Sequence, residues 1–231
     1  MRPVFDAYGE SYDDVMKKSI GFMGQGHDYY TSAKADCILD VLQRHFGNTE
    51  KLQVLDVGCG IGKTDGFLFH KLEKLSGVDI SSVSIERARR NNPQVHYKVY
   101  DGHTLPFAAA SFDSAFLICV LHHVVPAERN ALLQDVRRVL KPGGVLFIFE
   151  HNPFNPLTRL AVARCEFDRD AHLLSLRMAA DNVRRSGFSL QDSRYILFLP
   201  FKLKILRGLA FLRRVIPFGA QYFVTGVNHA E

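Results

Sequence analysis

The sequence predicts an α/β protein with a doubly wound, mainly parallel β-sheet, and three observations support this fold class. Short, almost continuous apolar runs alternate with helical patterns from residue 53 onward, as expected for strands buried on both faces. This alternation indicates crossover units, which make neighbouring strands parallel. A glycine-rich turn, DVGCGIG at residues 56–62, directly follows the first run. With 231 residues, the chain fits a single domain of this class.

Seven apolar runs are expected to form the strands. They span residues 53–58, 74–80, 95–101, 112–120, 145–151, 188–200 and 221–228. Helices are expected at 12–19 and 32–44, from Ser81 or Ser82 to Arg90, from Pro126 onward, at 156–166 and at 175–186. A serine before a helix and LKPGG after the Pro126 helix are typical start and stop signals.

Composition and charge exclude several other classes. Hydrophobic residues make up 47% of the chain and charged residues 23%, which predicts an ordered soluble protein. The net charge of +5 comes from five cations in one segment: Lys202, Lys204, Arg207, Arg213 and Arg214. The rest of the chain sums to zero charge, so nothing predicts a broad surface that binds nucleic acid. The four cysteines form no C-x-x-C pair, which predicts reduced thiols in the cytoplasm. We expect neither a secretory signal nor a membrane span, which needs about 20 apolar residues.

The glycine turn and the acids near it predict a cationic nucleoside ligand. The glycines permit a sharp turn and close approach of a ligand to the backbone, and the next helix adds free N–H groups. Lys63 stands where a dinucleotide-binding G-x-G-x-x-G would have its third glycine. Three aspartates at the strand ends would repel a pyrophosphate; they are Asp56, Asp79 and Asp101. They suit a ligand with a positive charge, a vicinal diol and an exocyclic amine, as in S-adenosylmethionine.

Six motifs occur in order along the chain: D-V-G-C-G-x-G at 56–62, G-V-D at 77–79, D-G-x-x-L-P-F at 101–107, F-D at 112–113, L-H-H at 121–123 and L-K-P-G-G at 140–144. Together they resemble the class I (seven-β-strand) S-adenosylmethionine-dependent methyltransferases. The resemblance implies a Rossmann-like mixed sheet of order 3-2-1-4-5-7-6, with the last strand antiparallel and helices on both faces. It also implies one domain in four sections: an N-terminal helical lid (1–45), a cofactor-binding core (50–151), a substrate-side helical insertion (152–187) and the final two strands (188–231).

The same resemblance implies cofactor-binding roles for residues at matching positions. The backbone of the turn, formed by Gly58, Cys59, Gly60 and Gly62, would hold the methionine part, with Cys59 itself as a small packing residue. Asp56 would help to place the ammonium group, Asp79 with Ile80 would bind the ribose, and Asp101 with Gly102 would bind the adenine. Cys119 and Val120 would line the floor near the sulfonium. Tyr12 and Tyr30 are lid candidates, although packing in the core or on the surface is the alternative for each.

Methyl transfer from a sulfonium is an in-line displacement, so the protein mainly aligns the two reactants and excludes water. A base would help if the acceptor is a hydroxyl, and the candidates are His151 first, then His123 and His122, all just past strand ends. Capping or packing is the alternative role for these histidines. No metal site is predicted, because neither H-E-x-x-H nor a third ligand at a matching spacing is visible.

The resemblance also implies that residues 1–45 and 151–185 select the acceptor, which is expected to be a small molecule, a sugar or a lipid-linked compound. The basic segment at 200–219 is either an amphipathic helix on an anionic membrane surface or a helix packed between the last two strands. Two other functions remain open at this point: a nucleotide-cofactor oxidoreductase, and a non-catalytic module that binds the cofactor. Nothing in the sequence predicts the oligomeric state or the methylated atom.

Overall fold

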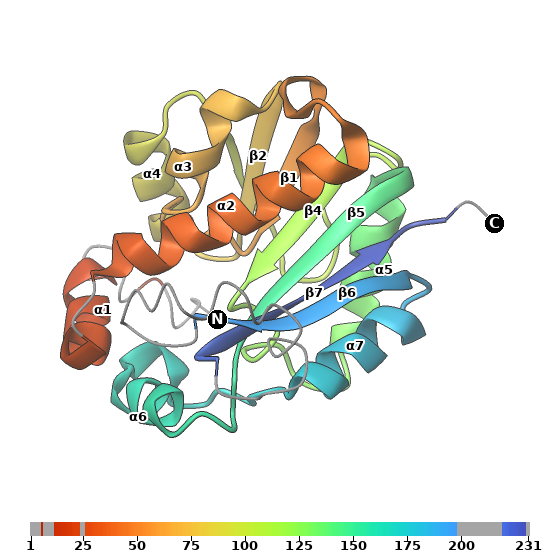
Figure 1. The fold of residues 1–231 in the computed structure, drawn as a ribbon. Coiled ribbons are helices and arrows are strands. Elements are labelled where there is room, and N and C mark those ends of the chain that lie inside the picture. Colours follow the sequence, from red (N-terminus) through yellow and green to blue (C-terminus); the bar gives the residue numbers. More distant parts are fainter. Residues whose placement is uncertain (1–5, 7–11, 24–25, 198–218, 230–231) are drawn as a thin grey trace.

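The computed structural model describes residue 6 and residues 12–23, 26–197 and 219–229. Its centre is a seven-stranded sheet of order β3-β2-β1-β4-β5-β7-β6 (Figure 1). The strands are β1 (Gln53–Val57), β2 (Lys74–Asp79), β3 (His96–Val99), β4 (Phe112–Ile118), β5 (Leu140–His151), β6 (Ser189–Ile196) and β7 (Gln221–Val227). The first five strands are parallel, and β7 runs antiparallel to both β5 and β6. The predicted strand order and the antiparallel last strand are therefore confirmed.

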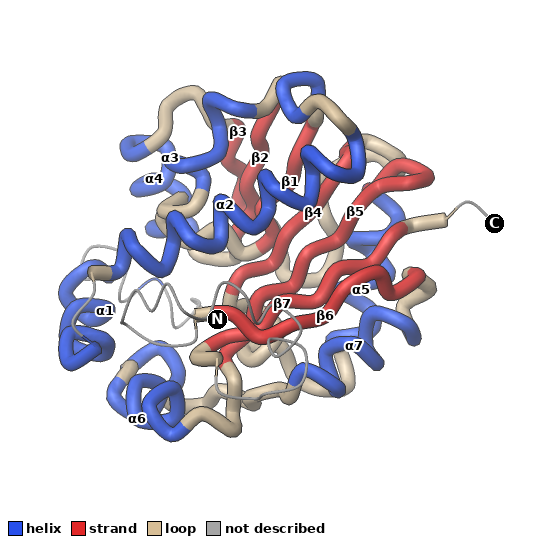
Figure 2. Tube along the Cα trace, in the orientation of Figure 1, coloured by secondary structure: helices blue, strands red, loops and turns tan. Residues whose placement is uncertain are grey.

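Helices cover both faces of the sheet (Figure 2). They are α1 (Tyr12–Ile20), α2 (His27–Phe46), α3 (Asp65–Leu68), α4 (Ser82–Asn91), α5 (Arg129–Val139), α6 (Pro156–Arg164) and α7 (Leu176–Arg185). The sheet has a hydrophobic core on each face, and alternate residues of a strand point into opposite cores. Leu146 and Ile148 belong to the core that includes α5 and α7, whereas Phe147 belongs to the core that includes α2 and α4. This two-layer burial explains why the strand runs are almost continuously apolar.

Local signals fix several helix starts at the sheet edge. Ser81 caps α4 by accepting a hydrogen bond from the Ser84 N–H at 3.1 Å, and Ser175 caps α7 in the same way. Asn155 accepts from the N–H groups of Leu157 and Thr158, with Pro156 in the first turn of α6. These caps satisfy N–H groups that a helix leaves without partners.

Several predicted boundaries are wrong, and three of them are starts of elements. Strand β5 begins at Leu140 rather than 145, because LKPGG extends along β4, where Phe112 pairs with Leu140 before the register shifts. Helix α2 begins at His27, five residues before the predicted 32. Helix α5 begins at Arg129, after a turn that contains Pro126.

The section from 152 to 187 divides into two parts. Helix α6 lies beside α1 at the carboxyl edge of the sheet, whereas α7 packs against β6, β7 and α5 (Figure 1). Helix α6 therefore lines the cavity at that edge, whereas α7 does not. Most of the predicted basic segment at 200–219 lies outside the described residues. Within the described ranges, none of the helices combines the length and the apolar character needed to cross a bilayer.

Candidate active site

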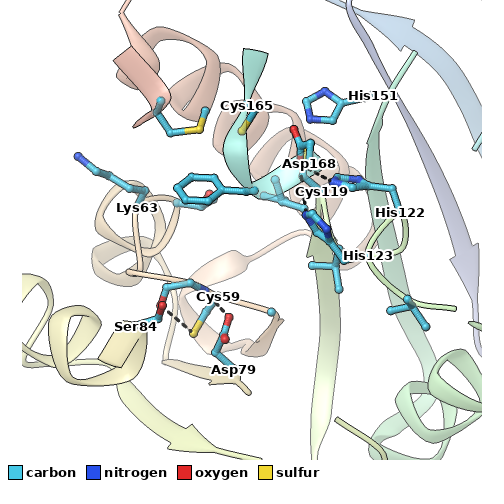
Figure 3. Close-up of a pocket in the computed structure, with 18 of the residues that line it drawn as sticks. Cys59, Lys63, Asp79, Ser84, Cys119, His122, His123, His151, Cys165 and Asp168 are labelled. Carbon is cyan, nitrogen blue, oxygen red and sulfur yellow. Dashed lines mark hydrogen bonds and ion pairs between the residues drawn. The ribbon is translucent and has the colours of Figure 1, made fainter. Parts of the chain in front are cut away.

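A cavity of about 810 Å³ opens at the carboxyl edge of the sheet, where the parallel strands β1, β2 and β4 end. Its lining comes from the glycine turn, from the loops after β2, β3 and β4, and from α1, α2, α6 and the 3-10 turn η5 (Glu166–Asp168). Figure 3 shows two groups of side chains in it. Cys59 and Asp79 lie at one end, and the histidines with Asp168 lie at the other.

The glycine turn holds backbone conformations that other residues adopt only with strain. Gly58, Gly60 and Gly62 have φ angles of 79°, 52° and 71°. A Cβ at Gly58 would lie 2.5 Å from Cγ2 of Val120, and one at Gly62 would lie 2.5 Å from the Tyr97 hydroxyl oxygen. A Cβ at Gly60 would meet no described atom within 4 Å, so this glycine faces the open cavity. The turn is therefore closely packed behind and exposed toward a ligand.

Asp79, at the end of β2, braces this turn. Its Oδ2 accepts a hydrogen bond from the Gly60 N–H and its Oδ1 accepts one from the Ser81 N–H, both at 2.8 Å. Burial raises the pKa of Asp79 above its usual value, although these N–H donors oppose the shift. Ile80 follows Asp79 and also lines the cavity. The carboxyl group thus connects the floor of the cavity to the glycine turn.

Asp56 forms a buried carboxyl pair with Asp65, a residue that the sequence analysis did not select. Oδ2 of Asp65 accepts a hydrogen bond of 2.6 Å from the Tyr97 hydroxyl. Oδ1 of Asp56 and Oδ1 of Asp65 are buried and have no other hydrogen-bond donor in the described chain. Burial, followed by the charge of Asp65, raises the pKa of Asp56 well above its usual value, and burial raises that of Asp65 to about 6. The pair therefore holds a proton more readily than isolated aspartates do.

Asp101 lies in the loop after β3, two residues beyond the strand rather than at its last position. Its Oδ1 accepts from the N–H groups of His103 and Thr104 at 2.8 Å, and these bonds lower its pKa. Asp101 and Gly102 both line the cavity. An ionised carboxylate therefore stands at the cavity rim.

The floor of the cavity includes Cys119 and Val120, which follow β4. Cys119 has a φ of 57°, which is unusual for a residue other than glycine, and its N–H donates to the Phe149 carbonyl at 2.8 Å. Burial raises the pKa of the Cys119 thiol, and burial together with nearby aspartates raises that of Cys59 well above its usual value. Both thiols are therefore protonated and unreactive at neutral pH.

The N-terminal section supplies part of the cavity wall. Tyr30 and Lys34 of α2 line the cavity, and Lys34 is buried with its cationic group near Cys119 and His151. Burial raises the pKa of the Tyr30 hydroxyl. The side chain of Tyr12, the other lid candidate, lies outside the described part of the structure.

His122 is held between two carboxylates at the far end of the cavity. Its Nδ1 lies 2.5 Å from Oε2 of Glu150. Its Nε2 lies 3.2 Å from Oδ1 of Asp168, a contact that Figure 3 shows. Burial acts to lower the pKa of His122, but the charge of Glu150 and the bonds to both acids raise it well above its usual value. Because both ring nitrogens face carboxylates, His122 is not placed to take a proton from an acceptor. This geometry argues against the prediction of His122 as a base.

His123 and His151 lie beside this arrangement. Nε2 of His123 is 3.3 Å from Oδ1 of Asp168, and Nδ1 of His151 is 3.3 Å from the side-chain nitrogen of Gln221. Burial lowers the pKa of His123, and it lowers that of His151 to about 4. Both imidazoles are therefore neutral at pH 7. The pKa of Asp168 is lowered by hydrogen bonds from the two neighbouring histidines, which outweigh the effect of burial.

Five residues of this site were missed by sequence reasoning: Lys34, Asp65, Glu150, Asp168 and Gln221. Asp65 follows the glycine turn closely, and Glu150 precedes His151, so their positions offered a signal. Asp168 and Gln221 lie far along the chain from the histidines that they contact. Only the fold brings them together.

Comparisons with known proteins agree with this site. A family model described as a methyltransferase domain matches residues 55–148. The O-methyltransferase cnsE of Penicillium expansum is 32% identical over 203 residues, covering 82% of this chain and 73% of that enzyme. A methyltransferase of Synechocystis is 35% identical over 104 residues; the match covers 45% of this chain and 49%, about half, of that relative.

Solved structures share the fold at lower identity. A methyltransferase from Thermotoga maritima aligns with a TM-score of 0.70 and 20% identity, covering 99% of both chains. The geranyl diphosphate C-methyltransferase of Streptomyces coelicolor, solved with S-adenosyl-L-homocysteine and Mg²⁺, has a TM-score of 0.61 and 17% identity, over 85% of this chain and 79% of that chain. The sheet order, the glycine turn and the relative that matches most of the chain lead to one conclusion. The chain belongs to the class I S-adenosylmethionine-dependent methyltransferase family.

Proposed function

We propose that the chain transfers the methyl group of S-adenosylmethionine to an oxygen of a small-molecule acceptor, and that one cavity holds both reactants. The observation that carries this proposal is the arrangement of the cavity, with aspartates and the glycine turn at one end and histidines at the other (Figure 3). Its volume of about 810 Å³ lies within the usual range for small-molecule sites. The relative named an O-methyltransferase supports an oxygen nucleophile.

At the donor end, the residues fit a cationic nucleoside. Oδ1 of Asp56 is a buried acceptor without a described donor, as expected where an ammonium group completes the site. Gly60 exposes backbone toward the cavity, and Asp79, which also lines the cavity, would accept hydrogen bonds from the ribose hydroxyls. Asp101 and Gly102 would hold the adenine end, and Cys119 and Val120 would form the floor. When bound, S-adenosylmethionine supplies a methyl group activated by a positive sulfur.

At the acceptor end, we assign His151 as the base that removes the hydroxyl proton. Oε1 of Gln221 is buried without a described partner, while its side-chain nitrogen faces Nδ1 of His151 and, at 3.4 Å, the Cys119 sulfur. Rotation of this amide by 180° exchanges its oxygen and nitrogen. The oxygen then accepts from the Nδ1–H of His151 and the Cys119 thiol, so Nε2 becomes the proton-accepting nitrogen. Such a base contributes about 10²–10⁴-fold to the rate.

The walls of the cavity favour a compact acceptor with apolar parts. Ala161 and Val162 of α6 and Phe167 of η5 line the acceptor end, while Lys34 provides a buried cation for an anionic or phenolic group. Sugar and lipid-linked acceptors are the other outcomes of the test below. Membrane contact through 200–219 and a cytoplasmic location stay predictions.

Two measurements test this function. Thermal unfolding should shift upward with S-adenosylhomocysteine, by about 2.7 kcal/mol of unfolding free energy at 100 times its dissociation constant, while NAD should have no effect. Incubation with methyl-labelled donor and panels of phenols, hydroxylated small molecules, sugars and lipid extracts should then label a small-molecule hydroxyl. Binding of S-adenosylhomocysteine without methyl transfer to any compound of the panels would support a non-catalytic module. Stabilisation by NAD would support an oxidoreductase.

A further inference from the structure

We propose that His122, His123 and Asp168 bind a divalent transition-metal ion at the acceptor end of the cavity. The potential ligand atoms of these three side chains all lie within 4.8 Å of one another. Nε2 of His122 and Nε2 of His123 lie 3.2 and 3.3 Å from the same oxygen, Oδ1 of Asp168. Metal–ligand bonds of about 2.0–2.2 Å at a tetrahedral angle separate two ligand atoms by roughly 3.4 Å. These two separations therefore match ligands that share an ion.

The ligand types suit this class of metal. Two imidazoles and one carboxylate form the donor set of several catalytic zinc and non-haem iron sites, which keep further coordination positions open. All three residues line the cavity, so water or an oxygen of the acceptor can complete the coordination from the cavity side. Calcium and magnesium prefer sets made only of oxygen atoms and fit this site less well.

A second carboxylate supports the arrangement from behind. Oε2 of Glu150 lies 2.5 Å from Nδ1 of His122, and Oε1 accepts from the His122 backbone N–H at 3.3 Å. A carboxylate on the outer nitrogen fixes the tautomer and orientation of a histidine ligand, and leaves Nε2 to face the metal. Glu150 and His122 are almost completely buried, and Asp168 is partly buried, so the group is held in a packed environment.

Long-range contacts explain why the spacing of residues in the sequence does not predict this site. His122 and His123 are adjacent in the turn after β4, whereas Asp168 comes from η5, 46 residues beyond His122. The backbone N–H of His172 also donates to the His122 carbonyl at 2.7 Å, which ties the segment after η5 to the histidine turn. The fold thus supplies the third ligand that the sequence lacked.

The alternative is that a proton, not a metal, holds these groups together. His122 would then be a permanent imidazolium between Glu150 and Asp168, and the site would have no affinity for metal. The two readings differ in metal uptake, which is measurable without donor or acceptor. A role for the ion in orienting an acceptor oxygen rests on the function proposed above. Binding of the ion does not rest on that function, so each proposal can be refuted without refuting the other.

The test is metal binding by the full chain after dialysis against EDTA. Calorimetric titration with ZnCl₂, and metal analysis after gel filtration, should give one Zn²⁺ per chain and a higher melting temperature. His123→Gln and Asp168→Asn should weaken binding by more than 100-fold, and Glu150→Gln by about 10–100-fold. The control His172→Gln, at an exposed histidine nearby, should bind like the wild type.

Two results would overturn the proposal. One is absence of Zn²⁺ uptake by the wild-type chain. The other is wild-type affinity in both His123→Gln and Asp168→Asn, which would place the ion elsewhere in the chain. Should these variants fail to fold, a crystal of the wild type soaked in ZnCl₂ decides the question: an anomalous peak between His122 and Asp168 supports the site, and its absence refutes it.

Discussion

Replacing Asp65 with asparagine is expected to stabilise the ligand-free protein at neutral pH. Asp65 is fully buried beside Asp56, and its pKa is raised from 3.8 to about 6. The pKa of this group is higher in the folded state than in the unfolded state. Its contribution to the unfolding free energy is therefore fully present below pH 3.8 and is lost as the pH rises through 6. The difference of about two units corresponds to roughly 3 kcal/mol of unfolding free energy at pH 7. Asp65→Asn removes this penalty, and it keeps an acceptor for the Tyr97 hydroxyl and gains a donor for Asp56.

The assay is urea denaturation of both proteins without cofactor, from pH 4 to pH 7.5. The variant should exceed the wild type by about 2–3 kcal/mol at pH 7.5, and the difference should shrink to near zero as pH falls to 4. Taking the difference cancels the titration of groups that do not interact with Asp65, whereas the coupled carboxyl group of Asp56 contributes to it. Asp170→Asn, at an exposed position, is the matched control and should change stability by less than about 0.5 kcal/mol. A variant that is no more stable than the wild type, or a difference that does not vary with pH, would refute the reasoning.

Three further predictions concern the glycine turn, Asp79 and the base. Gly58→Ala should lower the unfolding free energy by about 2–4 kcal/mol and abolish binding of S-adenosylhomocysteine, because its Cβ would clash with Val120. Gly60→Ala should lower the unfolding free energy by only about 1–2 kcal/mol, through backbone strain. Chemical denaturation and calorimetry compare the two variants, and equal losses would contradict the packing argument. Asp79→Ala should weaken S-adenosylhomocysteine binding at least 100-fold by calorimetry, and unchanged affinity would remove Asp79 from the site. His151→Gln should lower kcat by about 10²–10⁴-fold without changing S-adenosylhomocysteine affinity, and an unaltered kcat would exclude it as the base.

The fold was predictable because its signals are local. Near-continuous apolar runs mark strands covered on both faces, and Ser81 and Ser175 begin helices by hydrogen bonds within one turn. The predicted start of β5 was wrong for a physical reason. The proline and glycines of LKPGG weaken the apolar strand pattern, although the backbone at Leu140 still pairs with Phe112. Side-chain volume and periodicity carry no information about such irregular pairing.

The donor end of the site was predictable for a related reason. Its glycines and aspartates follow consecutive strands, and parallel strands bring their carboxyl ends to one edge. The acceptor end depends on contacts between distant segments, such as Asp168 with His122 and Gln221 with His151. These pairs are separated by 46 and 70 positions along the chain, so no spacing rule connects their members.

The donor end also links stability to binding through one set of charges. Asp56, Asp65 and Asp79 are all buried, and the charges of Asp65 and Asp79 add to burial in raising the pKa of Asp56. This arrangement costs stability in the empty protein, a cost that functional sites commonly carry. A bound cation would lower these pKa values and favour the ionised pair. Asp65→Asn should therefore weaken donor binding while it raises stability, and this weakening should be largest above pH 6. A purely structural carboxyl pair would change stability alone, so calorimetry on the same variant separates the two explanations.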